Sequence, residues 1–173
     1  STDANIVAGE WSHVSFTYNK FTSNVNLFVN NVLVGSVNDV FIDLSKSETN
    51  FAIGYDIDNV GIETHFNGAV DDIRIYNRVL PSSEMLYLSN SNNLDLFLKN
   101  QLVGHWTFEK FTTLVTDFVD TSVFENTSSL TSGNITSGSR PCSIAFDGLA
   151  TLSASNTGTN TNYISIATWI KPT

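Results

Sequence analysis

The chain has 173 residues, a length that fits one sizeable domain or two small ones. Its 17 acidic and 8 basic residues give a net charge of -9, which disfavours nucleic acid and anionic membrane surfaces as partners. No run of 18 apolar residues occurs, so we expect no membrane span, and the single cysteine, Cys142, excludes an internal disulfide.

The first half of the chain shows the pattern of short β-strands joined by turns. Apolar, β-branched and aromatic runs alternate with clusters of Asn, Gly, Ser and Asp. Asn30-Asn31 separates two such runs, and because asparagine tolerates the positive φ of a tight turn, we expect a β-hairpin there. In a later run, the alternation of apolar and polar residues shifts by one position at Asp71-Asp72. A β-bulge at this step would allow Val70, Ile73 and Ile75 all to point inward. The strands expected in this half are 13–18, 25–29, 32–37, 51–54 and 66–77.

One short helix is predicted at the end of this half. Pro81 is favoured in a first helical turn, and Glu84 suits the positive end of the helix dipole. We expect the helix to end near Asn90. Beyond it, strands are expected at 102–108, 112–118, 143–146, 150–153 and 163–170, with one short strand inside the polar stretch 125–138. Ten or eleven short strands and one helix predict an all-β protein, an antiparallel β-sandwich.

Several motifs in the first half follow one another in a recognisable order. Trp11-Ser12-His13-Val14 with Phe16-Thr17-Tyr18 is similar to a W-x-H-V-A-x-x-Y strand, and 26–34 (NLFVNNVLV) to an L-Y-V-N/D-G-x-L-V hairpin. The stretch 66–80 (FNGAVDDIRIYNRVL) is similar to a closing F-x-G-x-I-D-D-V-R-I-Y-N-R-A-L signature. Together these motifs resemble the laminin G-like jelly rolls of the concanavalin A-like lectin and glucanase superfamily. The resemblance implies a jelly-roll sandwich.

The second half resembles the beginning of such a domain, so the order of the halves is rotated. His105-Trp106-Thr107-Phe108-Glu109 is similar to the opening strand, and 164–172 (ISIATWIKP) to an F-T-I-S-A-W-V-K-P strand. We therefore divide the chain into a second half-domain at 1–90, a linker at 91–101 and a first half-domain at 102–173. Three interpretations stay open: two partial repeats of a tandem array, one permuted domain, or half-domains completed by strand exchange with neighbouring chains.

The carboxylates do not form the pattern of a glycoside hydrolase. Glucanases of the superfamily carry E-x-D-x-x-E on one strand, which places all three carboxylates on one face. That spacing is missing here, and Asp71 and Asp72 are adjacent, so we expect them to point to opposite faces. The resemblance implies a structural role for this pair, in which one carboxylate caps a loop or pairs with an arginine, either Arg74 or Arg78. We expect that the chain is not an enzyme.

Calcium is the cofactor that the resemblance implies. Related domains hold Ca²⁺ through oxygen ligands near the opening loop, where a D-x-S-G-x-G-N motif matches Asp117, Ser122 and Asn126 loosely. The candidate ligands carried over by position are Asp117, Asn126, Asp71 and Asp147. The alternative is that these side chains make ordinary loop turns.

Other polar and aromatic residues give weaker signals. Tyr55 and Tyr163 lie near loops and are candidates for stacking on a ligand, and Asp56 and Asp58 form an acidic cluster beside Tyr55. The three histidines, His13, His65 and His105, lack metal-ligand spacing, so we expect packing roles for the two that lie in strand motifs, His13 and His105. The three tryptophans fall in strand motifs and are expected in the core.

These observations predict a non-catalytic recognition module that binds a carbohydrate or a protein. The resemblance implies an extracellular location, on a cell surface or a virion surface, with a glycan or a surface protein as partner. The alternative is a structural or assembly module of a fibre, a shell or a virion surface, in which neighbouring chains or repeats complete the domain and form homo-oligomers.

Overall fold

The computed structural model describes residues 4–42, 51–54, 65–90, 99–108, 117–122, 127–130, 134–136, 143–147, 152–154 and 162–173. In these ranges the first half forms β1 (Ser12–Asn19), β2 (Asn24–Val29), β3 (Val32–Val37), β4 (Phe51–Ile53), β5 (Asn67–Tyr76) and α1 (Ser82–Asn90). The second half forms β6 (Leu102–Trp106), β7 (Asp117–Val119), β8 (Thr127–Leu130), β9 (Asn134–Thr136), β10 (Ser143–Asp147), β11 (Leu152–Ala154) and β12 (Tyr163–Pro172).

The predicted all-β class with antiparallel pairing and one short helix is confirmed. The polar stretch 125–138 contains two strands, β8 and β9, where one was predicted. The prediction was wrong there because the stretch is rich in Ser, Thr and Asn and has little apolar alternation by which strands can be recognised. No helix in the described ranges has the length and hydropathy to cross a membrane.

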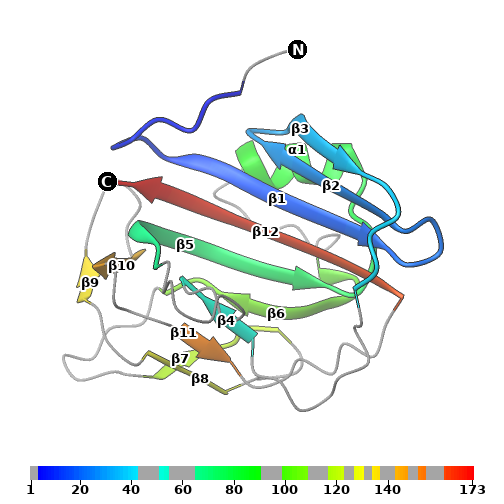
Figure 1. Cartoon of the computed structure of the whole chain (residues 1–173). Helices are drawn as coiled ribbons and strands as arrows, with labels where there is room; N and C mark the ends of the chain where they lie inside the picture. Colours follow the sequence, from blue (N-terminus) through cyan, green and yellow to red (C-terminus); the bar gives the residue numbers. More distant parts are fainter. Residues whose placement is uncertain are drawn as a thin grey trace.

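The larger sheet takes strands from both halves of the chain (Figure 1). Its order is β3-β2-β1-β12-β5-β10-β9, with β6 also paired to β5. The last strand, β12, therefore lies between β1 and β5. Its register with β1 runs from Ser12 opposite Ile170 to Asn19 opposite Tyr163. The smaller sheet has the order β4-β11-β8-β7.

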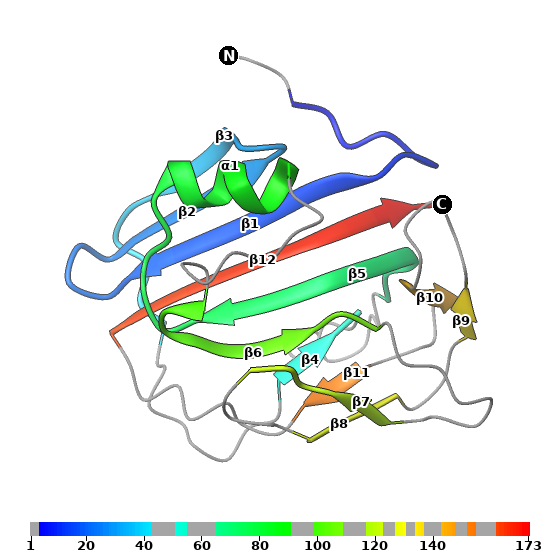
Figure 2. The ribbon, with the colours of Figure 1, turned by 180° about the vertical axis from the view of Figure 1, so that it is seen from behind.

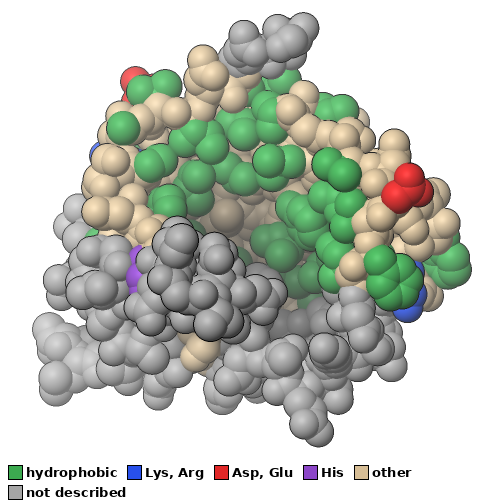
Figure 3. Space-filling model, viewed as in Figure 1, with side chains coloured by type: hydrophobic (Ala, Val, Ile, Leu, Met, Phe, Trp, Pro, Cys, Tyr) green, Lys and Arg blue, Asp and Glu red, His purple; other side chains and the backbone are tan. Residues whose placement is uncertain are grey.

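The inner face of the larger sheet carries the main core. Val70, Ile73 and Ile75 point inward as predicted, and all three are at most 3% exposed. Trp106 is fully buried in the same cluster. Figure 3, which views the molecule from the side opposite α1, shows hydrophobic side chains around a hollow on this face.

The predicted bulge at Asp71-Asp72 is confirmed. Between the pairs Arg74–Ala167 and Asp71–Trp169, β5 has two residues where β12 has one. The extra residue is accommodated at Asp72, whose φ is 51°. A residue in the left-handed region turns the strand locally, so the strand keeps its apolar residues inward on both sides of the bulge.

Helix α1 covers the outer face of the larger sheet (Figure 2). Met85 and Leu88 are each 2% exposed and pack with Tyr76, Leu80, Leu102 and Ala167. The hydroxyl of Ser15 in β1 donates to the Met85 sulfur at 3.3 Å. Glu84, in the first helical turn, forms an ion pair with Arg78, which anchors the start of the helix to the end of β5.

The predicted hairpin joins β2 and β3 through Asn30 and Asn31. Their φ values of 47° and 64° are those of a two-residue turn whose twist matches the flanking strands. The Asn30 side chain accepts a hydrogen bond from the His13 amide at 2.9 Å, and the Asn30 amide donates to the His13 carbonyl at 2.8 Å. The turn is thereby fastened to β1.

Gly68 allows the end of β12 to approach β5. Its φ of +147° lies in a region that favours glycine. A Cβ at this position would overlap the Lys171 carbonyl oxygen and lie 2.8 Å from the Pro172 Cα. Both are backbone atoms, so they cannot rotate away as a side chain would.

We predict that Gly68→Ala lowers the free energy of unfolding by about 2–4 kcal/mol, because backbone strain and the displacement of β12 add together. Urea unfolding followed by tryptophan fluorescence measures this change. The matched control is Gly35→Ala in β3, where an added Cβ meets only the Leu27 Cβ at 3.9 Å. The control should stay within about 0.5 kcal/mol of the parent chain. Equal effects of the two substitutions would contradict the prediction.

Candidate functional site

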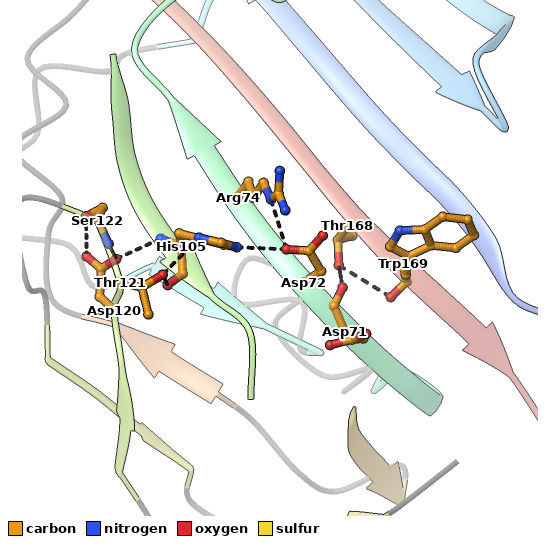
Figure 4. Close-up of polar contacts among 9 residues, drawn as sticks. All are labelled: Asp71, Asp72, Arg74, His105, Asp120, Thr121, Ser122, Thr168 and Trp169. Atoms are coloured by element: carbon orange, nitrogen blue, oxygen red, sulfur yellow. Dashed lines mark hydrogen bonds and ion pairs between the residues drawn. The ribbon is translucent and has the colours of Figure 1, made fainter. Parts of the chain in front are cut away.

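A buried ion cluster lies on the outer face of the larger sheet, beside the area that α1 covers. The Asp72 Oδ1 accepts hydrogen bonds from the Arg74 Nε at 2.9 Å and pairs with the His105 Nε2 at 2.8 Å (Figure 4). The side chains of Asp72, Arg74 and His105 are 13%, 8% and 5% exposed. Arg74 and His105 are directly opposite in the β5–β6 register, so the bulge at Asp72 brings its carboxylate to both. Of the two arginines proposed as partners of the Asp71-Asp72 step, Arg74 pairs with Asp72, whereas Arg78 pairs with Glu84.

A second set of contacts fastens His105 to the segment after β7. Its amide donates to the Asp120 Oδ1 at 2.7 Å, its Nδ1 lies 2.9 Å from the Thr121 Oγ1, and its carbonyl accepts from the Thr121 amide at 2.8 Å. Asp120, 1% exposed, also accepts from the amide and hydroxyl of Ser122 at 2.8 and 2.7 Å. The network therefore joins β5, β6 and residues 120–122.

The environment of Asp72 favours its ionised form. Burial alone raises the pKa of Asp72, but the hydrogen bond from His105 and the charge of Arg74 act in the opposite direction and prevail. The result is a pKa of about 2 instead of 3.8. The carboxylate is therefore negative across the ordinary pH range and matched by neighbouring donors.

The Thr121 hydroxyl, the His105 imidazole and the Asp72 carboxylate follow one another in the order of a hydrolase catalytic triad. Two contacts oppose that role. The Thr121 hydroxyl donates to the His105 carbonyl at 3.2 Å, and Arg74 holds the Asp72 oxygen that faces the imidazole. We interpret the cluster as a structural connection between the two halves of the chain.

Three of the four predicted calcium ligands are described, and they lie on three different strands. Asp71 is in β5 and 5% exposed, and its carbonyl accepts from the Thr168 hydroxyl at 3.0 Å. Asp147 is in the neighbouring strand β10, opposite Asn67, whereas Asp117 is in β7 of the smaller sheet. Asn126 lies outside the described residues. Within the described ranges no three His, Cys, Asp or Glu residues converge on one point. Calcium binding stays a prediction.

Asp120 is a residue of this cluster that sequence reasoning did not single out. It stands two residues before Ser122 and six before Asn126, the spacing of D-x-S-G-x-G-N, whereas Asp117 stands five residues before Ser122. His105, expected to pack, is buried but also carries the hydrogen bonds described above. The spacing of that motif was the signal for Asp120, and no motif indicated the hydrogen bonds of His105.

Among the predicted ligand-binding residues, Tyr163 is described and Tyr55, Asp56 and Asp58 lie outside the described residues. Tyr163 begins β12 and its ring packs against that of Phe21, with centroids 5.7 Å apart and planes at 53°. Phe21 is 71% exposed. It lies in the turn between β1 and β2, and sequence reasoning did not single it out.

Polar backbone and side-chain groups fix this pair of rings, which we name the aromatic corner (Phe21 and Tyr163). The Asn19 side chain accepts from the Phe21 amide at 2.9 Å, and the Asn162 carbonyl accepts from the Lys20 amide at 2.9 Å. Asn19 and Tyr163 are the last pair of the β1–β12 ladder. The corner is thus a partly exposed aromatic surface bordered by asparagines at one end of the sheet.

The other aromatic expectations concern the strand motifs. The Trp169 ring packs edge-on against His13 at 5.3 Å, which agrees with a packing role for His13. Trp106 is in the core as predicted, whereas Trp11 and Trp169 are only partly buried.

Comparison with known families gave one match. Residues 1–85 match the family model described as Concanavalin A-like lectin/glucanases superfamily, in agreement with the resemblance found in the sequence. The matched stretch is just under half of the chain and ends inside α1. Neither the curated proteins nor the solved structures gave a match.

We predict that Asp72→Asn lowers the free energy of unfolding by about 2 kcal/mol at pH 7. The pKa of Asp72 is lower in the folded chain than its ordinary 3.8, so its contribution is complete above about pH 4. It is lost as the pH falls toward about 2. The difference in the free energy of unfolding between variant and parent, measured by denaturant unfolding, should therefore shrink as the pH falls from about 4 to about 2.

The control for this substitution is Asp39→Asn, at an exposed aspartate that also has a positive φ, 60°. It should match the parent within about 0.5 kcal/mol at pH 7. If Asp72→Asn lowers the free energy of unfolding as much at pH 2 as at pH 7, the stabilisation by Asp72 is not electrostatic and the prediction is wrong.

Proposed function

We propose, on the premise that residues 1–85 belong to the concanavalin A-like lectin/glucanases superfamily, that this chain is a non-catalytic module that recognises carbohydrate. The membership implies a jelly-roll sandwich, and the antiparallel sheets agree with it. The observation that carries the proposal is the aromatic corner, in which the exposed Phe21 packs on the partly buried Tyr163 outside the core.

The chemistry of the corner suits a sugar. One face of a pyranose presents C–H groups that pack on aromatic rings, while its hydroxyls require hydrogen-bonding partners at the rim. Phe21 and Tyr163 offer the rings, and the exposed Asn162 offers a polar side chain beside them. A protein ligand that inserts an apolar side chain between these groups is the second candidate.

The carboxylates support a non-catalytic role. A glycosidase needs two carboxyl groups across a cleft, one with a raised pKa so that it can donate a proton. Asp72 has the opposite property, a lowered pKa, and Figure 4 shows the Asp71 carboxylate turned away from it. Both side chains are largely buried.

For the domain organisation we propose one permuted domain. The support is that β12, from the second half, pairs with β1 and β5 of the first half within one chain. In the assembly alternative, neighbouring chains exchange these halves, and β12 of one copy would pair with β1 and β5 of another. An extracellular location, on a cell or virion surface, follows from the superfamily by analogy.

We predict that Phe21→Ala and Tyr163→Ala each weaken glycan binding about tenfold or more, since aromatic contacts dominate such small interfaces. A glycan array identifies a bound glycan, and calorimetry with that glycan measures the affinity. The matched control is Tyr87→Ala, at a tyrosine of α1 that is 56% exposed and outside the corner. Equal losses for all three variants, or the absence of any bound glycan, would contradict the proposal.

A further inference from the structure

Strand β3 ends the larger sheet among the described strands, and its one described partner strand is β2. Val29 and Val32 flank the two-residue turn and form a hydrogen-bonded pair, so the next pair, Phe28 with Leu33, is a non-hydrogen-bonded one. By the same alternation, Ser36 opposite Asn26 is non-hydrogen-bonded. The N–H and C=O of Leu33 and Ser36 therefore point away from β2.

The side chains of this edge are unusual for a protein that stays alone. Leu33, Val34 and Val37 are 51%, 40% and 57% exposed. Edge strands are ordinarily protected by charged residues, proline or bulges; residues 21–38 contain no charged residue and no proline, and β3 has one bulge. An apolar strand with unpaired backbone groups is a template for another strand.

The distribution of charge in the chain favours β3 of a second copy as that other strand. A net charge of -9 makes two copies repel each other over most approaches. The uncharged segment 21–38 is a surface on which two copies can meet without opposing like charges. A two-fold axis places the same patch on both sides of the contact, so a neutral, apolar strand complements itself.

We propose that a second copy of this chain binds here, with β3 paired antiparallel to β3 about a two-fold axis. This inference goes beyond the proposed carbohydrate recognition and does not depend on it. The backbone N–H and C=O of Leu33 pair with those of Ser36 in the second copy, and those of Ser36 pair with those of Leu33 in the second copy. These two pairs set the register.

The bulge in β3 fits this register. The ladder shifts between Leu27 and Phe28, so Val34 is the extra residue of β3. With Leu33 opposite Ser36, the axis passes between Val34 and Gly35, and the bulge of each copy faces its symmetry mate. The half-exposed Val34 side chains then lie together at the centre of the contact, where apolar burial contributes most.

Sedimentation equilibrium over about a hundredfold range of protein concentration tests the proposal, because mass action makes a dimer concentration-dependent. We expect the parent mass to rise toward twice that of the chain. Val34→Asp and Val34→Lys should each weaken association about tenfold or more, since like charges meet at the axis. An equimolar mixture of the two variants should restore the dimer.

The matched control is Val79→Asp, at a valine that is 38% exposed between β5 and α1, and it should dimerise as the parent does. A parent that stays monomeric, a Val34→Asp dimer as tight as the parent, or a mixture that remains monomeric would each overturn the proposal. Hydrogen exchange on the unaltered chain gives a readout that needs no substitution. The Leu33 and Ser36 amides should gain protection as concentration rises, and unchanged protection would also overturn it.

Discussion

The fold depends on one strand, β12, and on its insertion between β1 and β5. Backbone hydrogen bonds on both edges of β12 join the beginning, the middle and the end of the chain into one sheet. Two local features of β5 admit it: Gly68, which leaves room for the backbone at Lys171 and Pro172, and the bulge at Asp72, which corrects the register. Without this strand, β1 and β5 would have unpaired inner edges and the core residues of β12 would be missing from the inner face.

The bulge also creates the polar cluster that connects the two halves. A strand residue normally alternates its side chain between faces, but the left-handed conformation at Asp72 directs its carboxylate to Arg74 and His105. Asp120 then holds the backbone of β6 from the other side. A buried carboxylate is costly unless donors surround it, and here they do, so the cluster orients the strands as well as contributing to stability.

The two proposed surfaces follow from different consequences of the same sheet. The aromatic corner forms where the β1–β12 ladder ends, because Asn19 opposite Tyr163 places the β1–β2 turn over the first residue of β12. The self-association edge exists because the sheet stops at β3 with uncharged residues. Association through β3 would leave Phe21 and Tyr163 outside the paired strands, so binding of a glycan and pairing of two copies are compatible, and a dimer would present two corners to a multivalent surface.

The sequence by itself determined the local elements and the class of fold. The hairpin at Asn30-Asn31, the helix after Pro81, the inward residues of β5 and the bulge at Asp72 all follow from turn chemistry and alternation, which act between near neighbours. The ordered motifs of the resemblance predicted that an arginine, Arg74 or Arg78, pairs with the Asp71-Asp72 step, and the structure shows that it is Arg74. Only the tertiary structure decided that β12 pairs with β1, that Asp72 also meets His105, and that Phe21 meets Tyr163. These contacts join residues between 33 and more than 140 positions apart, and the register that brings them together depends on the whole sheet.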